Sequence, residues 1–223
     1  MSVRRTASDA TFLFADIAGY TALTEAHGDE EAAALAQGFC RAVAERARRN
    51  SGHVVKTIGD AVMIRHESAV AAVDLGLTAA HEVLTDHGSP AVRVGMHHGP
   101  ALEQDGDWFG ATVNLAARIA GLAAGGEVLM SRAVIEATGE LSGVALDSRG
   151  YHQLRHVTEP IAVLAAVRDS RTEDERHLDP VCRMLVVDGR EAGMLRYREA
   201  TYRFCSLGCA ERFLRHPDAY VRA

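Results

Sequence analysis

Two aspartates stand where strand-like segments end, a pattern that can bind a metal ion. The apolar run TFLFADI reaches Asp16 shortly before Gly19, and Asp60 follows Gly59 between the apolar halves of VVKTIGDAVM, which predict a tight hairpin. Two carboxylates held together at strand ends cannot both stay ionised cheaply without a cation. Such hard oxygen ligands suit Mg²⁺ or Mn²⁺ and phosphate chemistry, whereas two ordinary turn aspartates are the alternative interpretation.

Asn114 and Arg118 form a second candidate group, in the segment ATVNLAARIAGLA. Residues four apart on a helix project side by side. A solvated polar face is the usual explanation for such a pair. The rest of this segment is almost entirely apolar or small, so these two side chains stand out and are candidates for binding a polar ligand.

Three cysteines crowd the end of the chain: Cys182, Cys205 and Cys209, at the spacing C-x22-C-x3-C. Cysteines four apart can share one ion from the start of a helix, and a cysteine from a preceding loop can complete the site. Soft thiolates favour Zn²⁺ or Cu⁺. A Cys205–Cys209 disulfide is the alternative, although a reducing compartment disfavours it. The fourth ligand is open among these candidates: His216, His177, Asp179 and solvent.

Hydrophobic periodicity predicts the elements that position these residues. Helices are expected at about 29–50, at about 68–85 and over ATVNLAARIAGLA, and a polar loop is expected over PALEQDGDWFG. Strands are expected over TFLFADI, on both sides of Gly59-Asp60, over AVRVGMHHG and EVLM, and near 144–154 and 161–167. This order predicts an α+β fold with one sheet under helices. Cys40, in the first helix, is expected to be a core cysteine.

Length and composition predict a large domain with a small one behind it. The chain has 223 residues, and the segment RDSRTEDERH has almost no apolar residue. We therefore expect a polar linker at 168–177 that separates a domain at 1–167 from a second at 178–223. A unit as small as the second normally needs a staple such as a metal. The net charge of −6 argues against a nucleic-acid partner, and no apolar run is long enough for a membrane span, so a cytoplasmic protein is expected.

Four motifs, FADIAGYT, KTIGDAVM, RVGMHHG and DWFGATVNLAARI, resemble the class III nucleotidyl cyclase catalytic domain in order and spacing, over roughly Ala10 to Val167. The resemblance implies a ferredoxin-like, palm-like α+β sandwich and a two-metal reaction. In that reaction the ribose 3′-hydroxyl of a nucleoside triphosphate attacks the α-phosphorus, forming a cyclic 3′,5′-phosphodiester and releasing pyrophosphate. The resemblance also implies a head-to-tail homodimer with sites shared between chains, so that Lys56 and Asp60 act in different sites.

The same resemblance implies roles for the first two groups of residues. Asp16, Asp60 and the carbonyl of Ile17 would hold two Mg²⁺ or Mn²⁺ ions per site. Asn114 would orient the ribose, and Arg118 would stabilise charge that develops on the α-phosphate.

Four further positions bear on the substrate. Arg93 matches a position that contacts the terminal phosphates. Arg155 is expected to contact them as well, although the family usually has lysine there, followed by glycine where this chain has His156. Lys56 matches the position that donates to adenine N1 in adenylate cyclases, and Asp107 matches the partner that accepts from the adenine amino group. Guanine reverses this donor and acceptor, so ATP is the expected substrate.

The end of the chain resembles the YHS domain, which is related to metal-binding modules with the same cysteine spacing. The motifs DPVCRM, YRFCSLGC and HPDAY carry this resemblance from about Leu178 to Tyr220. The family commonly has glycine where Arg183 stands. A structural zinc, a metal-sensing site and a domain without metal all fit this resemblance.

Two classes of function follow. The first is an adenylate cyclase that converts ATP to 3′,5′-cyclic AMP as a homodimer and is modulated by a metal-binding tail. The second is a metal-binding sensor or trafficking protein that uses a catalytically weak cyclase fold as a dimerisation scaffold. The first is favoured because the expected residue type is present at every catalytic position: Asp16, Asp60, Asn114 and Arg118.

Overall fold

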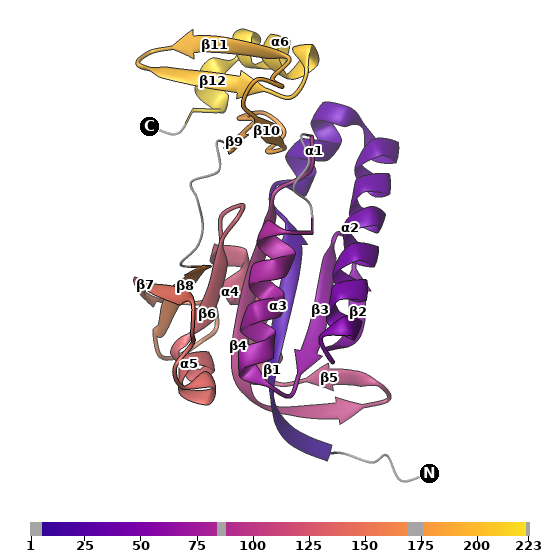
Figure 1. Ribbon diagram of the computed structural model, residues 1–223, viewed down its shortest axis with the longest axis vertical. Coiled ribbons are helices and arrows are strands. Elements are labelled where there is room, and N and C mark those ends of the chain that lie inside the picture. The colour runs from indigo at the N-terminus through magenta and orange to yellow at the C-terminus, as the bar shows by residue number, and fades with distance from the viewer. Residues whose placement is uncertain (1–5, 84–87, 169–175, 222–223) are drawn as a thin grey trace.

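The computed structural model describes residues 6–83, 88–168 and 176–221. It contains a large domain up to Arg168 and a tail domain from Arg176, which runs from orange to yellow in Figure 1. Most of the expected linker at 168–177 lies outside the described residues, as do residues 84 and 85 of the second expected helix.

One mixed sheet forms the middle layer of the large domain. Its strands run in the order β2-β3-β1-β4-β6-β8-β7, and β5 pairs with β4. Neighbouring strands are antiparallel, except that β4 and β6 are parallel. The strands are β1 (Thr6–Ile17), β2 (His53–Ile58), β3 (Ala61–His66), β4 (Val92–Gln104), β5 (Asp107–Phe109), β6 (Val128–Ser131), β7 (Val144–His152) and β8 (Ile161–Arg168).

Helices cover both faces of this sheet, which confirms the expected α+β sandwich. The helices are α1 (Tyr20–His27), α2 (Asp29–Arg49), α3 (Ala69–His81), α4 (Ala111–Leu122) and α5 (Arg132–Thr138). Side chains alternate between the faces of a strand. Accordingly Leu13 of β1 belongs to the apolar core under α2, α3 and α5, whereas Phe12 and Phe14 belong to the core under α4. None of the described helices has the length and hydropathy that a bilayer crossing requires.

Gly95 allows α4 to lie unusually close to the sheet. A Cβ atom at this position in β4 would overlap the backbone of Ile119 and Ala120 in α4. Such an approach is available only to a residue without a side chain. Gly95 therefore fixes the height of the helix that carries Asn114 and Arg118.

The segment expected to be a polar loop is a β-hairpin, so this part of the prediction is wrong. Strand β4 continues to Gln104, and β5 pairs back along it from Asp107 to Phe109. Asp105 and Gly106 form the turn with φ of 55° and 81°. Two consecutive positive φ values suit an Asp-Gly turn between antiparallel strands. The hairpin places Asp107 at the start of β5.

The tail domain has two small sheets and one helix. Its elements are β9 (Arg176–Leu178), β10 (Leu185–Val187), β11 (Gly193–Tyr197), β12 (Ala200–Phe204), α6 (Leu207–Arg215) and a 3₁₀ turn (Pro217–Ala219). Strand β9 pairs with β10, and β11 pairs with β12. Phe213 of α6 packs against the aromatic rings of Tyr202 and Phe204.

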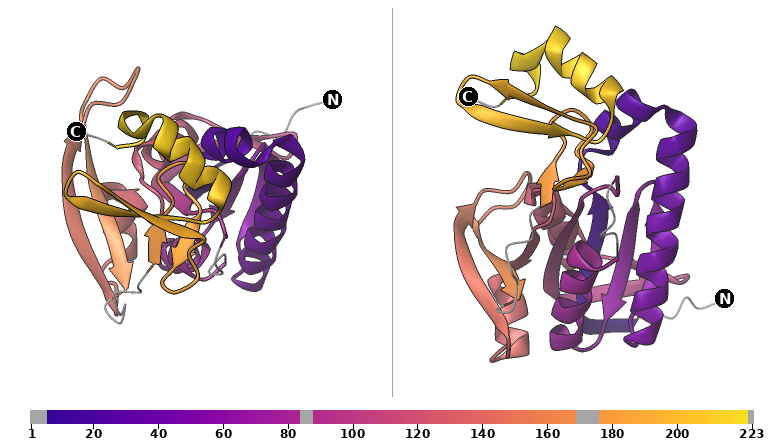
Figure 2. Two further views of the ribbon diagram at one scale, coloured as in Figure 1. Left: turned by 90° about the horizontal axis from the view of Figure 1, so that it is seen from above. Right: turned by 45° about the horizontal axis from the view of Figure 1, so that its top comes forward.

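The two domains are in contact. The Leu185 amide donates to the Ser89 carbonyl at 2.8 Å, and the Gly88 amide donates to the Leu185 carbonyl at 2.9 Å. Met184 and Cys182 are buried in the same apolar core as the large domain. Figures 1 and 2 show the tail domain beside α1. The shared core and the backbone hydrogen bonds join the two domains.

Candidate functional site

Asp16 and Asp60 lie together at one end of the sheet. Asp16 is opposite Ala61 across the β1–β3 pair, and Asp60 occupies the turn before it, where Gly59 has φ +62°. Burial, a hydrogen bond with Asp16 and the charge of Asp16 raise the pKa of Asp60 to about 6. A carboxyl group whose ionisation is opposed by burial and by a neighbouring carboxylate suits a hard divalent cation. Ile17 follows Asp16 with its side chain buried in the core.

Arg93 reaches this carboxylate pair from β4. It is opposite Asp16 in the strand register and donates from Nε at 2.9 Å and from Nη2 at 2.5 Å to Asp16 Oδ2. Its charge also opposes the rise in the pKa of Asp60. The structure thus brings together Asp16, Asp60 and Arg93.

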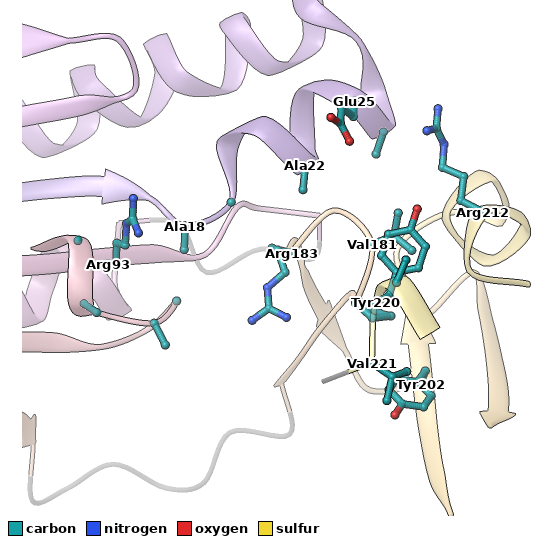
Figure 3. Close-up of a pocket in the computed structure, with 18 of the residues that line it drawn as sticks. Ala18, Ala22, Glu25, Arg93, Val181, Arg183, Tyr202, Arg212, Tyr220 and Val221 are labelled. Carbon is teal, nitrogen blue, oxygen red and sulfur yellow. The ribbon is translucent and has the colours of Figure 1, made fainter. Parts of the chain in front are cut away.

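A hollow of about 820 Å³ opens beside Arg93 between the large domain and the tail. In Figure 3, Arg93 and Ala18 lie on its large-domain side, and Arg183 and Arg212 project from the tail side. Arg183 has φ +66°, a conformation that favours glycine, and its Cγ lies only 2.8 Å from where a Cβ of Gly19 would be. Three arginines against one acidic lining residue, Glu25, suit a polyanionic ligand.

Lys56 and Asp107 form an ion pair on the edge of the sheet. Lys56 Nζ of β2 donates to Asp107 Oδ2 of β5 at 2.5 Å. The hydrogen bond from Lys56 is the main reason why the pKa of Asp107 lies below its ordinary value. The structure thus brings the two expected base-recognition residues together within one chain.

Asn114 and Arg118 line a separate hollow of about 320 Å³ with His156. Arg155 is exposed and its Nε donates to His156 Nε2 at 3.0 Å, so Arg155 lies next to this hollow rather than in its lining.

The predicted site residues therefore fall into three groups within one chain. The first is the carboxylate pair with Arg93, the second is the Lys56–Asp107 pair, and the third is the polar pair on α4. Among the described residues, no hydrogen bond or ion pair joins one of these groups to another.

The three tail cysteines converge, and a residue of the large domain joins them. Cys182 Sγ lies 3.4 Å from Cys205 Sγ, which lies 3.9 Å from Cys209 Sγ. The Nε2 atom of His27 in α1 lies 3.8 Å from Cys205 Sγ and 3.9 Å from Cys209 Sγ. All four possible ligand atoms lie within 4.8 Å of one another. All three cysteines are free thiols.

The expected candidates for a fourth ligand are not in this cluster. His177 pairs with Asp188 at 3.0 Å, and His216 is exposed at the end of α6. Asp179 is fully buried and supports the cluster from behind, because its carboxylate accepts hydrogen bonds from the amides of Val181, Cys182 and Cys205. Sequence reasoning missed His27 because it lies at the opposite end of the chain.

Two protein families match this chain, one in each domain. A family model described as the adenylate and guanylate cyclase catalytic domain matches residues 3–162. The chain belongs to this family. A second model, the YHS domain, matches residues 177–223, so a YHS domain follows the cyclase domain.

Curated relatives resemble the cyclase part. A Mycobacterium tuberculosis protein named pH-sensitive adenylate cyclase is 36% identical over 154 residues, which are 68% of this chain and 38% of that protein. An adenylate cyclase of Streptomyces coelicolor is 35% identical over 123 residues, which are 55% of this chain and 32% of that protein. The chain thus spans about a third of the length of these relatives.

Solved structures support the cyclase fold. An adenylate/guanylate cyclase/hydrolase from Silicibacter pomeroyi is 27% identical with a TM-score of 0.65, over 74% of this chain and all of that one. The adenylyl cyclase CyaB of P. aeruginosa is 22% identical with a TM-score of 0.66, over 76% of this chain and 98% of that one, which shows a shared fold.

Cys40 in α2 of the cyclase domain packs against the apolar core, as expected, but is not fully enclosed by it. Its side chain is only partly buried, and its Sγ lies 4.0 Å from the carbonyl oxygen of Gly59. Burial and the charges of Asp60 and Asp16 raise the pKa of the Cys40 thiol. The sequence offered no signal for this position, which follows from how α2 lies over the β2–β3 turn.

Proposed function

We propose that the chain is an adenylate cyclase that forms 3′,5′-cyclic AMP and pyrophosphate from ATP, at sites shared between the two chains of a homodimer. The observation that carries the proposal is the Asp16–Asp60 pair beside Arg93. Two adjacent carboxylates, of which Asp60 has a raised pKa, fit a metal-bound polyphosphate together with Arg93, which contacts Asp16 and also lines a basic hollow.

The carboxylates of Asp16 and Asp60, with the carbonyl of Ile17, are the proposed ligands for two Mg²⁺ or Mn²⁺ ions. When bound, such ions supply Lewis-acid stabilisation of the phosphates and of the attacking oxygen. Arg93 binds the terminal phosphates from the same end of the sheet.

Adenine is the proposed base because Lys56 and Asp107 present a donor and an acceptor side by side. An ammonium has three protons and a carboxylate has about four acceptor positions, so each side chain retains capacity after pairing with the other. Lys56 donates to N1 and Asp107 accepts from the exocyclic amine. Guanine would place donor against donor and acceptor against acceptor.

Asn114 and Arg118 complete the proposed site from the second chain. Asn114 orients the ribose, and Arg118 stabilises charge that develops on the α-phosphate in the transition state. Arg155, beside the same hollow, is proposed to meet the terminal phosphates. The separation of the three groups within one chain supports this arrangement, because a head-to-tail dimer can bring the first group of one chain to the other two groups of its partner.

The direct test incubates purified full-length protein with ATP and Mn²⁺, and in parallel with GTP, and identifies the cyclic product by chromatography. Cyclic AMP is expected from the wild type, and none from Asp60→Ala at an unchanged circular dichroism spectrum. Cyclic GMP as the main product would contradict the base assignment. No product from either nucleotide, in folded dimeric protein, would favour the scaffold function over the enzyme.

A further inference from the structure

We propose that His27 of the cyclase domain and the three cysteines of the YHS domain form one zinc site, so that a single ion bridges the two domains. His27 is the last residue of α1, and Cys205 and Cys209 flank the start of α6. The ligand set is therefore drawn from both domains and not from the tail alone. This proposal does not depend on the nucleotide that the cyclase uses.

The distances fit a tetrahedral zinc ion. Zinc–sulfur bonds of about 2.3 Å place two sulfurs of a tetrahedron about 3.8 Å apart, and a histidine nitrogen slightly closer. Two of the three sulfur–sulfur distances are 3.4 Å and 3.9 Å, and two of the three nitrogen–sulfur distances are 3.8 Å and 3.9 Å. The remaining two pairs of ligand atoms lie within 4.8 Å. The four distances given differ from the ideal values by a few tenths of an ångström. Three thiolates with one imidazole form a closed site of the structural zinc type.

The surroundings hold each ligand in position. The buried carboxylate of Asp179 accepts from the amides of Cys182 and Cys205. The hydroxyl of Ser206 accepts from the amide of Cys209 at 3.2 Å. The imidazole of His27 turns Nε2 towards the sulfurs, while its Nδ1 lies 3.6 Å from a carboxylate oxygen of Glu31. A carboxylate behind the outer nitrogen is the usual support of a metal-bound histidine.

Because His27 lies on α1, an ion bound by His27 would restrain this helix. Helix α1 begins at Tyr20, three residues after Ile17, and ends at His27. The tail contacts both ends of it, because Arg183 packs against Gly19 and the cysteines surround His27. An ion bound by His27 therefore fixes α1 to the tail, and with it the segment that leads out of the Asp16–Ile17 end of β1.

Metal binding by reduced full-length protein tests the proposal. We expect one Zn²⁺ per chain by elemental analysis. With Co²⁺ as a spectroscopic substitute, we expect the visible absorption of a tetrahedral site with three thiolates and one nitrogen. His27→Ala should weaken Zn²⁺ binding at least tenfold and change the Co²⁺ spectrum. His216→Ala is the matched control, because this exposed tail histidine lies outside the cluster, and it should leave both readouts unchanged.

A second variant and a second measurement keep the proposal testable if His27→Ala misfolds. His27→Cys should retain the metal and shift the Co²⁺ spectrum to that of four thiolates. Hydrogen exchange should slow in α1 when Zn²⁺ binds wild-type protein, and not when it binds His27→Ala. Wild-type affinity and spectrum in His27→Ala would overturn the proposal. So would a reduced wild-type protein that binds no zinc, or a native Cys182–Cys205 disulfide.

Discussion

Lys56 of β2 and Asp107 of β5 form an ion pair at the edge of the sheet, with 2.5 Å between Lys56 Nζ and Asp107 Oδ2. The hydrogen bond from Lys56 lowers the pKa of Asp107, so this acceptor is a carboxylate at neutral pH. Lys56 is also the only lysine in a chain that otherwise uses arginine for its fixed positive charges. A compact ammonium at the edge of the sheet is suited to donating to one ring nitrogen, whereas the guanidinium fork of arginine favours two parallel acceptors.

Reversal of this pair should reverse the choice of base. In Lys56→Glu combined with Asp107→Ser, position 56 accepts and position 107 can donate, which matches N1–H and O6 of guanine. We expect kcat/KM for ATP to fall by about 100-fold or more and GTP to become the better substrate. Steady-state kinetics with both nucleotides measures this. An unchanged ATP:GTP ratio would show that the pair does not read the base.

Chemical labelling offers a test of the same pair without catalysis. An amine-reactive reagent can modify only Lys56 and the N-terminal amine, and peptide mapping separates the two. ATP with Ca²⁺, used to limit turnover, should slow modification of Lys56 several-fold and leave the N-terminus unaffected. Equal protection by GTP, or none by ATP, would argue against a contact between Lys56 and adenine.

Gly95→Ala should disrupt the candidate site indirectly, by displacing α4 from the sheet. The added Cβ overlaps the backbone of α4, which cannot yield as a flexible side chain can. We expect a loss of about 2 kcal/mol or more in the free energy of unfolding and a displaced α4, with reduced activity. Gly121→Ala is the matched control in the same helix, since an added Cβ there meets nothing within 4 Å, and it should be neutral or stabilising by up to about 1 kcal/mol. Equal stability of the two variants would contradict the close-approach argument.

His97 should make the folded protein less stable in acid. Burial, with a smaller contribution from the charge of His98, lowers the pKa of His97 to about 4. Between about pH 4 and the ordinary histidine value of about 6.5, the unfolded chain binds a proton that the folded chain does not. Stability through this group is therefore complete above about pH 6.5 and is lost as the pH falls, by at most about 1.4 kcal/mol per pH unit.

His97→Gln is the variant for this test, because glutamine can still bond with Ser131 Oγ, which lies 2.6 Å from His97 Nδ1. Urea titrations of metal-free protein measure the unfolding free energy of both proteins. As the pH falls from about 6.5 to 4.5, the wild type should lose stability relative to the variant. Asp60 has the opposite effect between about pH 4 and 6, since its pKa is raised, but it is present in both proteins and cancels. A difference that is constant with pH would contradict the prediction.

Local sequence patterns predicted most of the helices and strands of the cyclase domain. The apolar periodicity of residues 29–50 predicted α2 within one residue at its end, and Gly59-Asp60 marked the β2–β3 turn. The two aspartates could be placed together because Asp16 lies near the end of β1 and Asp60 lies directly before β3, which pairs with β1 in the antiparallel sense. The β4–β5 hairpin was missed although Asp105-Gly106 is a strong turn signal, since few apolar residues flank it.

Contacts between distant segments could not be predicted in this way. The three cysteines that surround His27 lie at the other end of the chain, so this group of residues becomes visible only when the tail packs on α1. The tail's contact with Ser89 is a hydrogen bond between backbone atoms, so it cannot be predicted from the types of the side chains. The polar composition of the linker indicated solvent exposure of that segment and carried no information on whether the domains beyond it touch.

Mixing two inactive variants tests the shared-site cyclase most directly. Asp16→Ala removes the metal group and Arg118→Ala removes the α4 group, so each homodimer should fail to make cyclic AMP. In a mixed dimer, one site retains both residues and the other lacks both. Random pairing makes about half of the dimers mixed, each with one working site, so the mixture should recover up to about a quarter of wild-type activity. No cyclic AMP from the mixture, with subunit exchange demonstrated by mass spectrometry, would contradict the account.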